Sequence, residues 1–359
     1  MKDNIPVTQP FLPPREEYES LLADIWDRNW LTNNGPLVQK LEDKLTDYLG
    51  VKELSVVSNG TIALQIAMKA LNLEGEIITT PFSYVATTSS IVWENHTPVF
   101  VDIHPNTLNM DPQKMEAAIS PNTSAILATH VYGNPCDIEA IQAIAARHNL
   151  KVIYDAAHCF GTKYKGKSVF NYGDISTCSF HATKLFHTVE GGAMVTDDPD
   201  LLRKINLMRN FGHDGPNNFT GVGINGKNSE LHAAMGLVNL RHIDSVLARR
   251  KKLSEIYDHC LEDVDLSKPI IQSQSKYNFS YYPVLFNSEK QVVDTQEKLT
   301  EANIQTRRYF YPLLSELDYV DGNNTPVASR VAKRILCLPF YHELSEKSIA
   351  RICKIIKSV

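Results

Sequence analysis

Short apolar stretches alternate with helical patterns over the first two thirds of the chain. The expected strands cover residues 54–58, 76–79, 98–102, 125–130, 151–155, 176–180 and 192–196. Several are almost entirely apolar, as strands are when helices cover both faces of their sheet. Helical periodicity lies between them, at residues 61–71, 85–93, 112–119 and 138–148. This alternation predicts an α/β fold with a mostly parallel sheet and right-handed crossovers.

The pattern changes near residue 245. Beyond it, helical stretches at residues 244–261, 291–302 and 345–357 surround a few extended pieces, notably residues 278–285. We therefore expect a large domain over residues 1–244, which includes the N-terminal segment, and a smaller α+β domain over residues 245–359.

Composition and charge narrow the classes of function. The chain has 359 residues, 43% of them hydrophobic, which is enough to bury a core and excludes a disordered or fibrous protein. A net charge of -5 without basic runs argues against binding to nucleic acid or to anionic membranes. Six irregularly spaced cysteines, no secretory signal and no apolar stretch of about 20 residues predict a cytoplasmic protein with reduced thiols. The twelve histidines lack zinc-site spacing, so no metal site is expected.

Ligands of open α/β sheets bind beyond the carboxyl ends of the strands. Asn59, Gly60 and Thr61 follow the first expected strand, and a helix is expected to begin at Thr61. Free N–H groups at a helix start favour a phosphate, and Thr61 could cap the helix and offer its hydroxyl. An ordinary strand-to-helix turn is the alternative.

Two further strands end in residues with distinct chemistry. Asp155 ends residues 151–155 and could keep a ring nitrogen protonated, with His158 in reach of the same ring; an Asp that caps the next turn is the alternative. Lys184 follows the next strand between apolar residues, where desolvation makes an amine nucleophilic, as in Schiff-base lysines. Most lysines are solvated surface residues, but the apolar neighbours of Lys184 argue against that alternative.

A phosphate seat, an acid for a ring nitrogen and an amine for an aldehyde match the three ends of pyridoxal 5'-phosphate (PLP), the expected cofactor. The stretch YDAAHCFGTKYKGKSVFNYGDISTCSFHATKLFHTVEGGAMVTDDPDL resembles sugar aminotransferases of the DegT/DnrJ/StrS type. These are fold type I (aspartate aminotransferase-like) PLP-dependent transferases. The resemblance extends from Trp30 to the C-terminus.

The resemblance implies roles for individual residues. Lys184 would form the Schiff base and shuttle the proton, and Asp155 would pair with the pyridine nitrogen. The other implied cofactor contacts are Gly60, Thr61 and Ser179 at the phosphate, Tyr84 stacked on the ring, His158 beside the phenolic oxygen, and Asn225 reaching the phosphate of a partner subunit. A homodimer with shared active sites is thus implied.

The chain departs from the family pattern after Asn225. Relatives often read G-x-N-Y-R-M where this chain has Gly-Ile-Asn-Gly-Lys-Asn over residues 223–228, so the role of Lys227 is open. Substrate contacts are expected at His187, Lys227, Arg308 and Tyr311. For His187, a packed neighbour is the alternative. For Arg308 and Tyr311, together with Tyr309, the alternative is a cluster at a domain interface.

The resemblance also implies a reaction. L-Glutamate would donate its amino group to a dTDP-linked keto-6-deoxy sugar. The stretches SNGTIALQIAMKAL and SFHATKLFHTVEGGA resemble the subgroup that aminates dTDP-4-keto-6-deoxy-D-glucose at C4, giving dTDP-4-amino-4,6-dideoxy-D-glucose. Amination of a dTDP-3-keto-6-deoxyhexose at C3 is the alternative. Either product suits deoxyamino sugar biosynthesis for an O-antigen or lipopolysaccharide.

Other classes of protein are less consistent with the residues. Related sugar dehydratases replace the lysine with histidine or add clustered cysteines, and this chain does neither. An NAD-dependent sugar-nucleotide oxidoreductase needs a glycine fingerprint after its first strand; the G-x-G-x-x-G at residues 221–226 instead follows a polar loop. A non-catalytic binding protein on the same fold is the third alternative.

Overall fold

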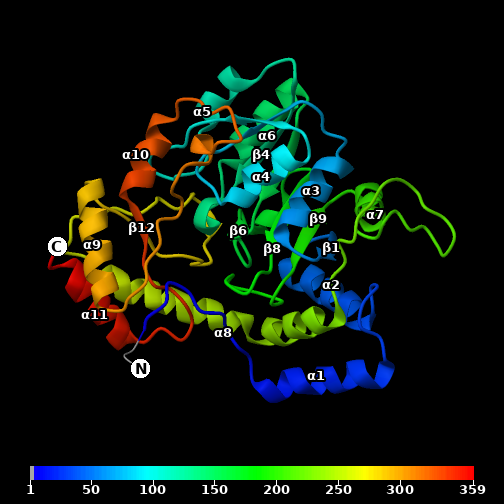
Figure 1. Ribbon diagram of the computed structural model, residues 1–359, viewed down its shortest axis with the longest axis horizontal. Helices are drawn as coiled ribbons and strands as arrows, with labels where there is room; N and C mark the ends of the chain where they lie inside the picture. The colour runs from blue at the N-terminus through cyan, green and yellow to red at the C-terminus, as the bar shows by residue number, and fades with distance from the viewer. Residues whose placement is uncertain (1–3) are drawn as a thin grey trace.

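The computed structural model describes residues 4–359 and centres on a seven-stranded sheet (Figure 1). The strand order is β1 (Glu53–Val57), β9 (Gly192–Thr196), β8 (Ile175–Ser179), β5 (Lys151–Asp155), β4 (Thr123–Thr129), β2 (Glu76–Thr79) and β3 (Thr97–Phe100). β9 is antiparallel to β1 and β8, and the other neighbouring strands are parallel. The predicted α/β fold with a mostly parallel sheet is confirmed, and each expected strand ends within two residues of the observed one.

Helices cover both faces of this sheet because successive strand residues point to opposite sides. In β5, Val152 and Tyr154 pack in one core, and Ile153 packs in another. The first core includes α2 (Pro36–Leu49) and α6 (Ile138–His148); the second includes α3 (Gly60–Ala70), α4 (Val85–Trp93) and α7 (Pro199–Met208). The strands are therefore buried on both faces, as their apolar sequences predicted.

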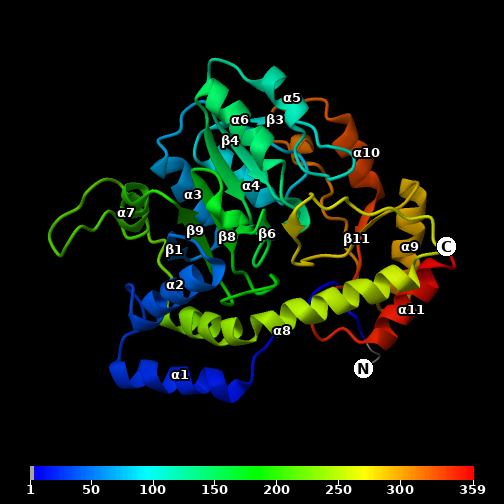
Figure 2. The ribbon, with the colours of Figure 1, turned by 180° about the vertical axis from the view of Figure 1, so that it is seen from behind.

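A long helix, α8 (Glu230–Cys260), connects the sheet to the C-terminal part of the chain (Figure 2). Ala233 and Leu237 belong to the core of the sheet, whereas Leu253 and Tyr257 belong to the C-terminal core. The sequence predicted a helix only from residue 244. Residues 233–239 are all buried, so this part of α8 lacks the polar face that reveals a helix in a sequence. The expected domain boundary at 244/245 lies inside α8, and the division stays a prediction.

The C-terminal part combines helices with a two-stranded antiparallel sheet. It contains β11 (Pro283–Leu285), β12 (Ile335–Cys337), α9 (Glu289–Glu301), α10 (Pro326–Arg334) and α11 (Glu346–Ile356). Only the end of the expected extended piece, residues 278–285, forms a strand.

Several smaller elements complete the described chain. The sequence patterns did not reveal α1 (Arg15–Arg28) or α2, and α5 (Pro112–Met115) is shorter than the expected 112–119 because it passes into a 3₁₀ turn, Glu116–Ala118. A small sheet is formed by β6 (Lys163–Tyr164), β7 (Lys167–Ser168) and β10 (Ser275–Lys276). Within residues 4–359, no helix combines the length and the apolar character needed to cross a bilayer.

Candidate active site

A cavity of about 620 Å³ opens at the carboxyl ends of β5 and β8. It brings together residues that lie far apart in the sequence. Seven of the predicted site residues line it: Gly60, Thr61, Tyr84, Asp155, His158, Ser179 and Lys184.

Asp155 ends β5 and is held by hydrogen bonds from two sides. Its carboxylate accepts from the Thr87 hydroxyl at 2.8 Å and from the Ala157 N–H at 3.2 Å. Thr87 is hydrogen-bonded to Ser83 at 2.7 Å, and Ser83 to Thr129 at 3.0 Å. These buried hydroxyls fix the carboxylate at the floor of the cavity, a supporting role that the sequence analysis missed.

Burial shifts the pKa values of Asp155 and Lys184 in opposite directions. It raises the pKa of Asp155, and the Thr87 hydroxyl, the Ala157 N–H and the charge of Lys184 lower that pKa. Burial lowers the pKa of Lys184, and the nearby Asp155 opposes this. A desolvated amine is unprotonated more often, which makes it a better nucleophile. A desolvated carboxylate gains from a cationic partner, such as a protonated ring nitrogen.

The first turn of α3 forms a candidate anion-binding site at the cavity. The Asn59 side chain caps α3 by accepting from the Ile62 N–H at 2.9 Å, so the expected cap by Thr61 is wrong. Asn59 is the N-cap because it directly precedes Gly60, the first residue of the helix. A Cβ on Gly60 would meet the Cβ of Ser179 at 2.9 Å, so glycine lets the start of α3 approach the end of β8. Thr61 and Ser179 therefore keep hydroxyls at the cavity beside free helix N–H groups.

His158 and Tyr84 bring rings to the cavity. The His158 ring is stacked on Phe310 with 6.0 Å between centroids, and burial lowers the pKa of His158 well below its usual value. Its Nδ1 is buried and has no hydrogen-bond partner within residues 4–359, so a bound group could supply one. Tyr84 precedes α4 and is 51% exposed, which leaves a ring face free.

These features fit PLP. The anion-binding site suits its phosphate, Asp155 its ring nitrogen and Lys184 its aldehyde, and the unpartnered nitrogen of His158 suits a polar atom on the ring. The part of the chain that the structure describes holds no group of three His, Cys, Asp or Glu side chains placed to share a metal ion.

The structure does not bring His187 to this cavity. The imidazole is buried, and its Nε2 lies 2.7 Å from the Phe11 carbonyl oxygen. Asn239 of α8 donates to the His187 carbonyl at 2.9 Å. In this environment His187 is a packed neighbour, which was the alternative to a substrate contact.

The segment around Arg308 presents different residues to the cavity from those expected. Arg308 forms an ion pair with Glu289 at 2.9 Å and lies 3.7 Å from the centroid of the Tyr311 ring, away from the cavity lining. Arg307 and Tyr309 line the cavity instead. Phe310 lines it as well. The sequence analysis considered Tyr309 together with Arg308 and Tyr311, but it missed Arg307 and Phe310.

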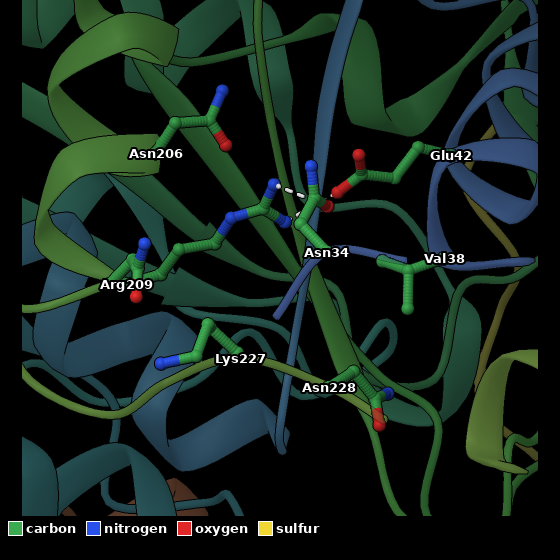
Figure 3. Close-up of a pocket in the computed structure, with 8 residues that line it drawn as sticks. Asn34, Val38, Glu42, Asn206, Arg209, Lys227 and Asn228 are labelled. Atoms are coloured by element: carbon green, nitrogen blue, oxygen red, sulfur yellow. Dashed lines mark hydrogen bonds and ion pairs between the residues drawn. The ribbon is translucent and has the colours of Figure 1, made fainter. Parts of the chain in front are cut away.

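Lys227 lines a different pocket, of about 290 Å³ (Figure 3). In this pocket Arg209 forms an ion pair with Glu42 and donates to the Val56 carbonyl at 2.6 Å. Lys227 lies over the ring of Phe211, 4.9 Å from its centroid. The pocket is completed by asparagines and one valine: Asn34, Asn206, Asn210, Asn228 and Val38.

Asn225 lines neither pocket and is exposed in the loop between α7 and α8. The G-x-G-x-x-G sequence, residues 221–226, lies in the same loop. It does not join a strand to a helix, the context that a dinucleotide fingerprint requires.

Comparison with known proteins decides the family. The model of the DegT/DnrJ/EryC1/StrS aminotransferase family matches residues 14–357. The chain belongs to this family. It is therefore a PLP-dependent sugar aminotransferase with the fold of that family, and the expected family and enzyme class are confirmed.

Individual relatives resemble the chain over its whole length. It is 45% identical over 366 residues to the dTDP-4-amino-4,6-dideoxy-D-glucose transaminase of Shigella dysenteriae, with 100% of both chains covered. It is 43% identical to the Escherichia coli enzyme of the same name, with 98% of each covered. The structure of DesI in the presence of its TDP-sugar product aligns with a TM-score of 0.94 at 33% identity, covering 100% of this chain and 93% of DesI.

Proposed function

We propose that this enzyme transfers the amino group of L-glutamate to dTDP-4-keto-6-deoxy-D-glucose, forming dTDP-4-amino-4,6-dideoxy-D-glucose. The observation that carries the proposal is the meeting of Lys184 and Asp155 in one cavity of a chain 43% and 45% identical to two transaminases of that name. Amination at C3 of a dTDP-3-keto sugar is the second candidate, because the same residues serve either carbon.

PLP is the proposed cofactor. Gly60, Thr61 and Ser179 would hold its phosphate, Asp155 its ring nitrogen and Lys184 its aldehyde carbon. Bound there, PLP supplies a carbonyl that accepts the amino group and a ring that withdraws electrons.

The side chains of the enzyme carry the protons. With its pKa lowered by burial, Lys184 has a neutral amine more often and can take the proton from Cα of the donor. The same amine returns a proton to C4 of the sugar. Because one amine acts from one side, the proton reaches one face of the sugar, and the configuration of the new centre is set. Asp155, oriented by Thr87, holds the proton at the ring nitrogen.

A homodimer with shared sites is part of the proposal. The loop between α7 and α8 exposes large apolar side chains: Phe211 is 49% exposed, Phe219 62% and Val222 87%. Such a patch supports a subunit interface on this loop, from which Asn225 would reach the phosphate in the partner. A cytoplasmic location and a role in O-antigen synthesis stay predictions.

Product analysis tests the proposal. The purified enzyme with PLP would be incubated with L-glutamate and, separately, the 4-keto and 3-keto dTDP sugars, and the products examined by NMR. We expect an amine at C4 from the 4-keto sugar, and none when glutamate is omitted. A product only at C3 supports the second candidate, and no amino sugar from either substrate refutes both.

A further inference from the structure

We propose that Arg307 is the binding group for a carboxylate of the amino donor. This inference rests on the proposed function, and it concerns a residue that neither the sequence patterns nor the resemblance pointed to. Arg307 should matter in only one half of the reaction, because the amino acid carries carboxylates and the keto sugar does not.

Arg307 is exposed to solvent where it lines the cavity, and its positive charge has no partner among the described residues. It lines the same cavity as Lys184, and it forms no ion pair or side-chain hydrogen bond with any residue from 4 to 359. Its neighbour Arg308 instead faces Glu289. A guanidinium held without an anionic partner in a substrate cavity is ready to receive one from the substrate.

The backbone and a stacking contact hold Arg307 in place. The Cys337 N–H donates to the Arg307 carbonyl at 2.8 Å, and the Arg307 N–H donates to the Cys337 carbonyl at 3.3 Å. The guanidinium carbon lies 4.9 Å from the centroid of the Tyr309 ring. Arg307 therefore extends from a paired stretch of the C-terminal part, which limits where its fork can point.

Tyr309 contacts Arg307 and lines the same cavity as the amine of Lys184. Burial raises the pKa of Tyr309, and the charges of Arg307 and Lys184 both lower it. The Arg307 guanidinium packs against the Tyr309 ring, and both residues line the cavity that contains Lys184. A donor whose nitrogen takes the place of the Lys184 amine would have its carboxylate within this region.

Other charges of the cavity already have roles. The phosphate seat lies at α3, and Asp155 is needed at the ring nitrogen. Glu190 lies 3.6 Å from the His181 ring, so this acid and this histidine face each other. Arg307 remains as the second anion site, and its planar fork forms two parallel hydrogen bonds with a carboxylate. Two fixed points, amine and carboxylate, would turn the Cα hydrogen toward Lys184.

Separate half-reactions test this role. The PLP form of each variant would be mixed with L-glutamate under single-turnover conditions, and enzyme loaded with pyridoxamine phosphate would be mixed with the keto sugar. In Arg307→Gln we expect the glutamate concentration that gives half the maximal rate of its half-reaction to rise about 10- to 100-fold, as for lost hydrogen bonds to a charged group. Arg307→Lys should recover part of the loss. The sugar half-reaction should be unchanged in both variants.

The controls separate this inference from the proposed function. Arg330→Gln removes an exposed arginine of α10 outside the cavity lining and should leave both half-reactions unchanged. The visible absorption band of bound PLP, retained in every variant, shows that the cofactor site has folded. A loss in the sugar half-reaction alone would assign Arg307 to the nucleotide diphosphate, and equal losses or no loss would also overturn the inference. A wild-type enzyme without the PLP band would instead overturn the proposed function.

Discussion

Thr87 offers a direct test of how the fold prepares Asp155. The substitution Thr87→Val keeps a similar shape at a fully buried position of α4 and removes one hydroxyl. That hydroxyl donates to Asp155 at 2.8 Å and is also hydrogen-bonded to Ser83. The variant therefore leaves a buried carboxylate with one hydrogen bond fewer.

The expected magnitude follows from that contact. A hydrogen bond to a charged group contributes about 1.5–3 kcal/mol, so the free energy of unfolding should fall by about this amount. The Thr87 hydroxyl lowers the pKa of Asp155, so its removal raises that pKa further. A carboxylate with a higher pKa takes up its proton at a higher pH. The acid limb of kcat/KM for glutamate should therefore move toward higher pH.

The assay compares two neighbouring hydroxyls. Thr88 is equally buried, but its hydroxyl has no hydrogen-bond partner in residues 4–359. Thr88→Val should therefore leave activity and its pH profile unchanged and should not reduce stability to urea. Thr87→Ser, which keeps the hydroxyl, should restore the pH profile. If Thr87→Val and Thr88→Val behaved alike, or if the acid limb stayed in place, the assigned role of Thr87 would be wrong.

Three further predictions concern the cofactor, acid stability and the subunit interface. Lys184→Ala should lose the PLP band in the visible spectrum and reduce turnover by several orders of magnitude, and an active, coloured variant would contradict its role. Burial lowers the pKa of His130 to about 3, whereas an unfolded histidine titrates near 6.5. Stability from this group is complete above about pH 6.5 and is lost toward pH 3 at up to about 1.4 kcal/mol per pH unit. The free energy of unfolding, measured with urea between about pH 4 and 7, should fall less steeply with decreasing pH in His130→Gln than in the wild type. An unchanged dependence on pH would refute the assignment. Mixing Asn225→Ala and Lys184→Ala subunits should restore activity in part, because hybrid dimers would hold one intact site; no gain on mixing would count against shared sites.

The sequence by itself determined the sheet and the order of its chemical groups. A chain of apolar, β-branched strands separated by amphipathic helices has few alternatives to an α/β fold, because strands covered on both faces must be apolar throughout. Asp155 and Lys184 could be chosen because Asp155 ends one strand and Lys184 comes shortly after the next, and the ends of parallel strands meet at one edge. Both inferences use neighbours within a few residues.

Only the tertiary structure decided which side chains surround those groups. The hydrogen bond from Thr87 to Asp155 joins residues 68 positions apart, and no local pattern indicates it. His187 lies against the N-terminal segment rather than in the cavity lining, because Phe11, 176 residues away, supplies its hydrogen-bond partner. Arg307 rather than Arg308 lines the cavity, and its backbone is paired with Cys337, 30 residues away. Local pattern depends on the period of a helix or strand, whereas a contact depends on where distant segments pack, and that was determined by the fold as a whole.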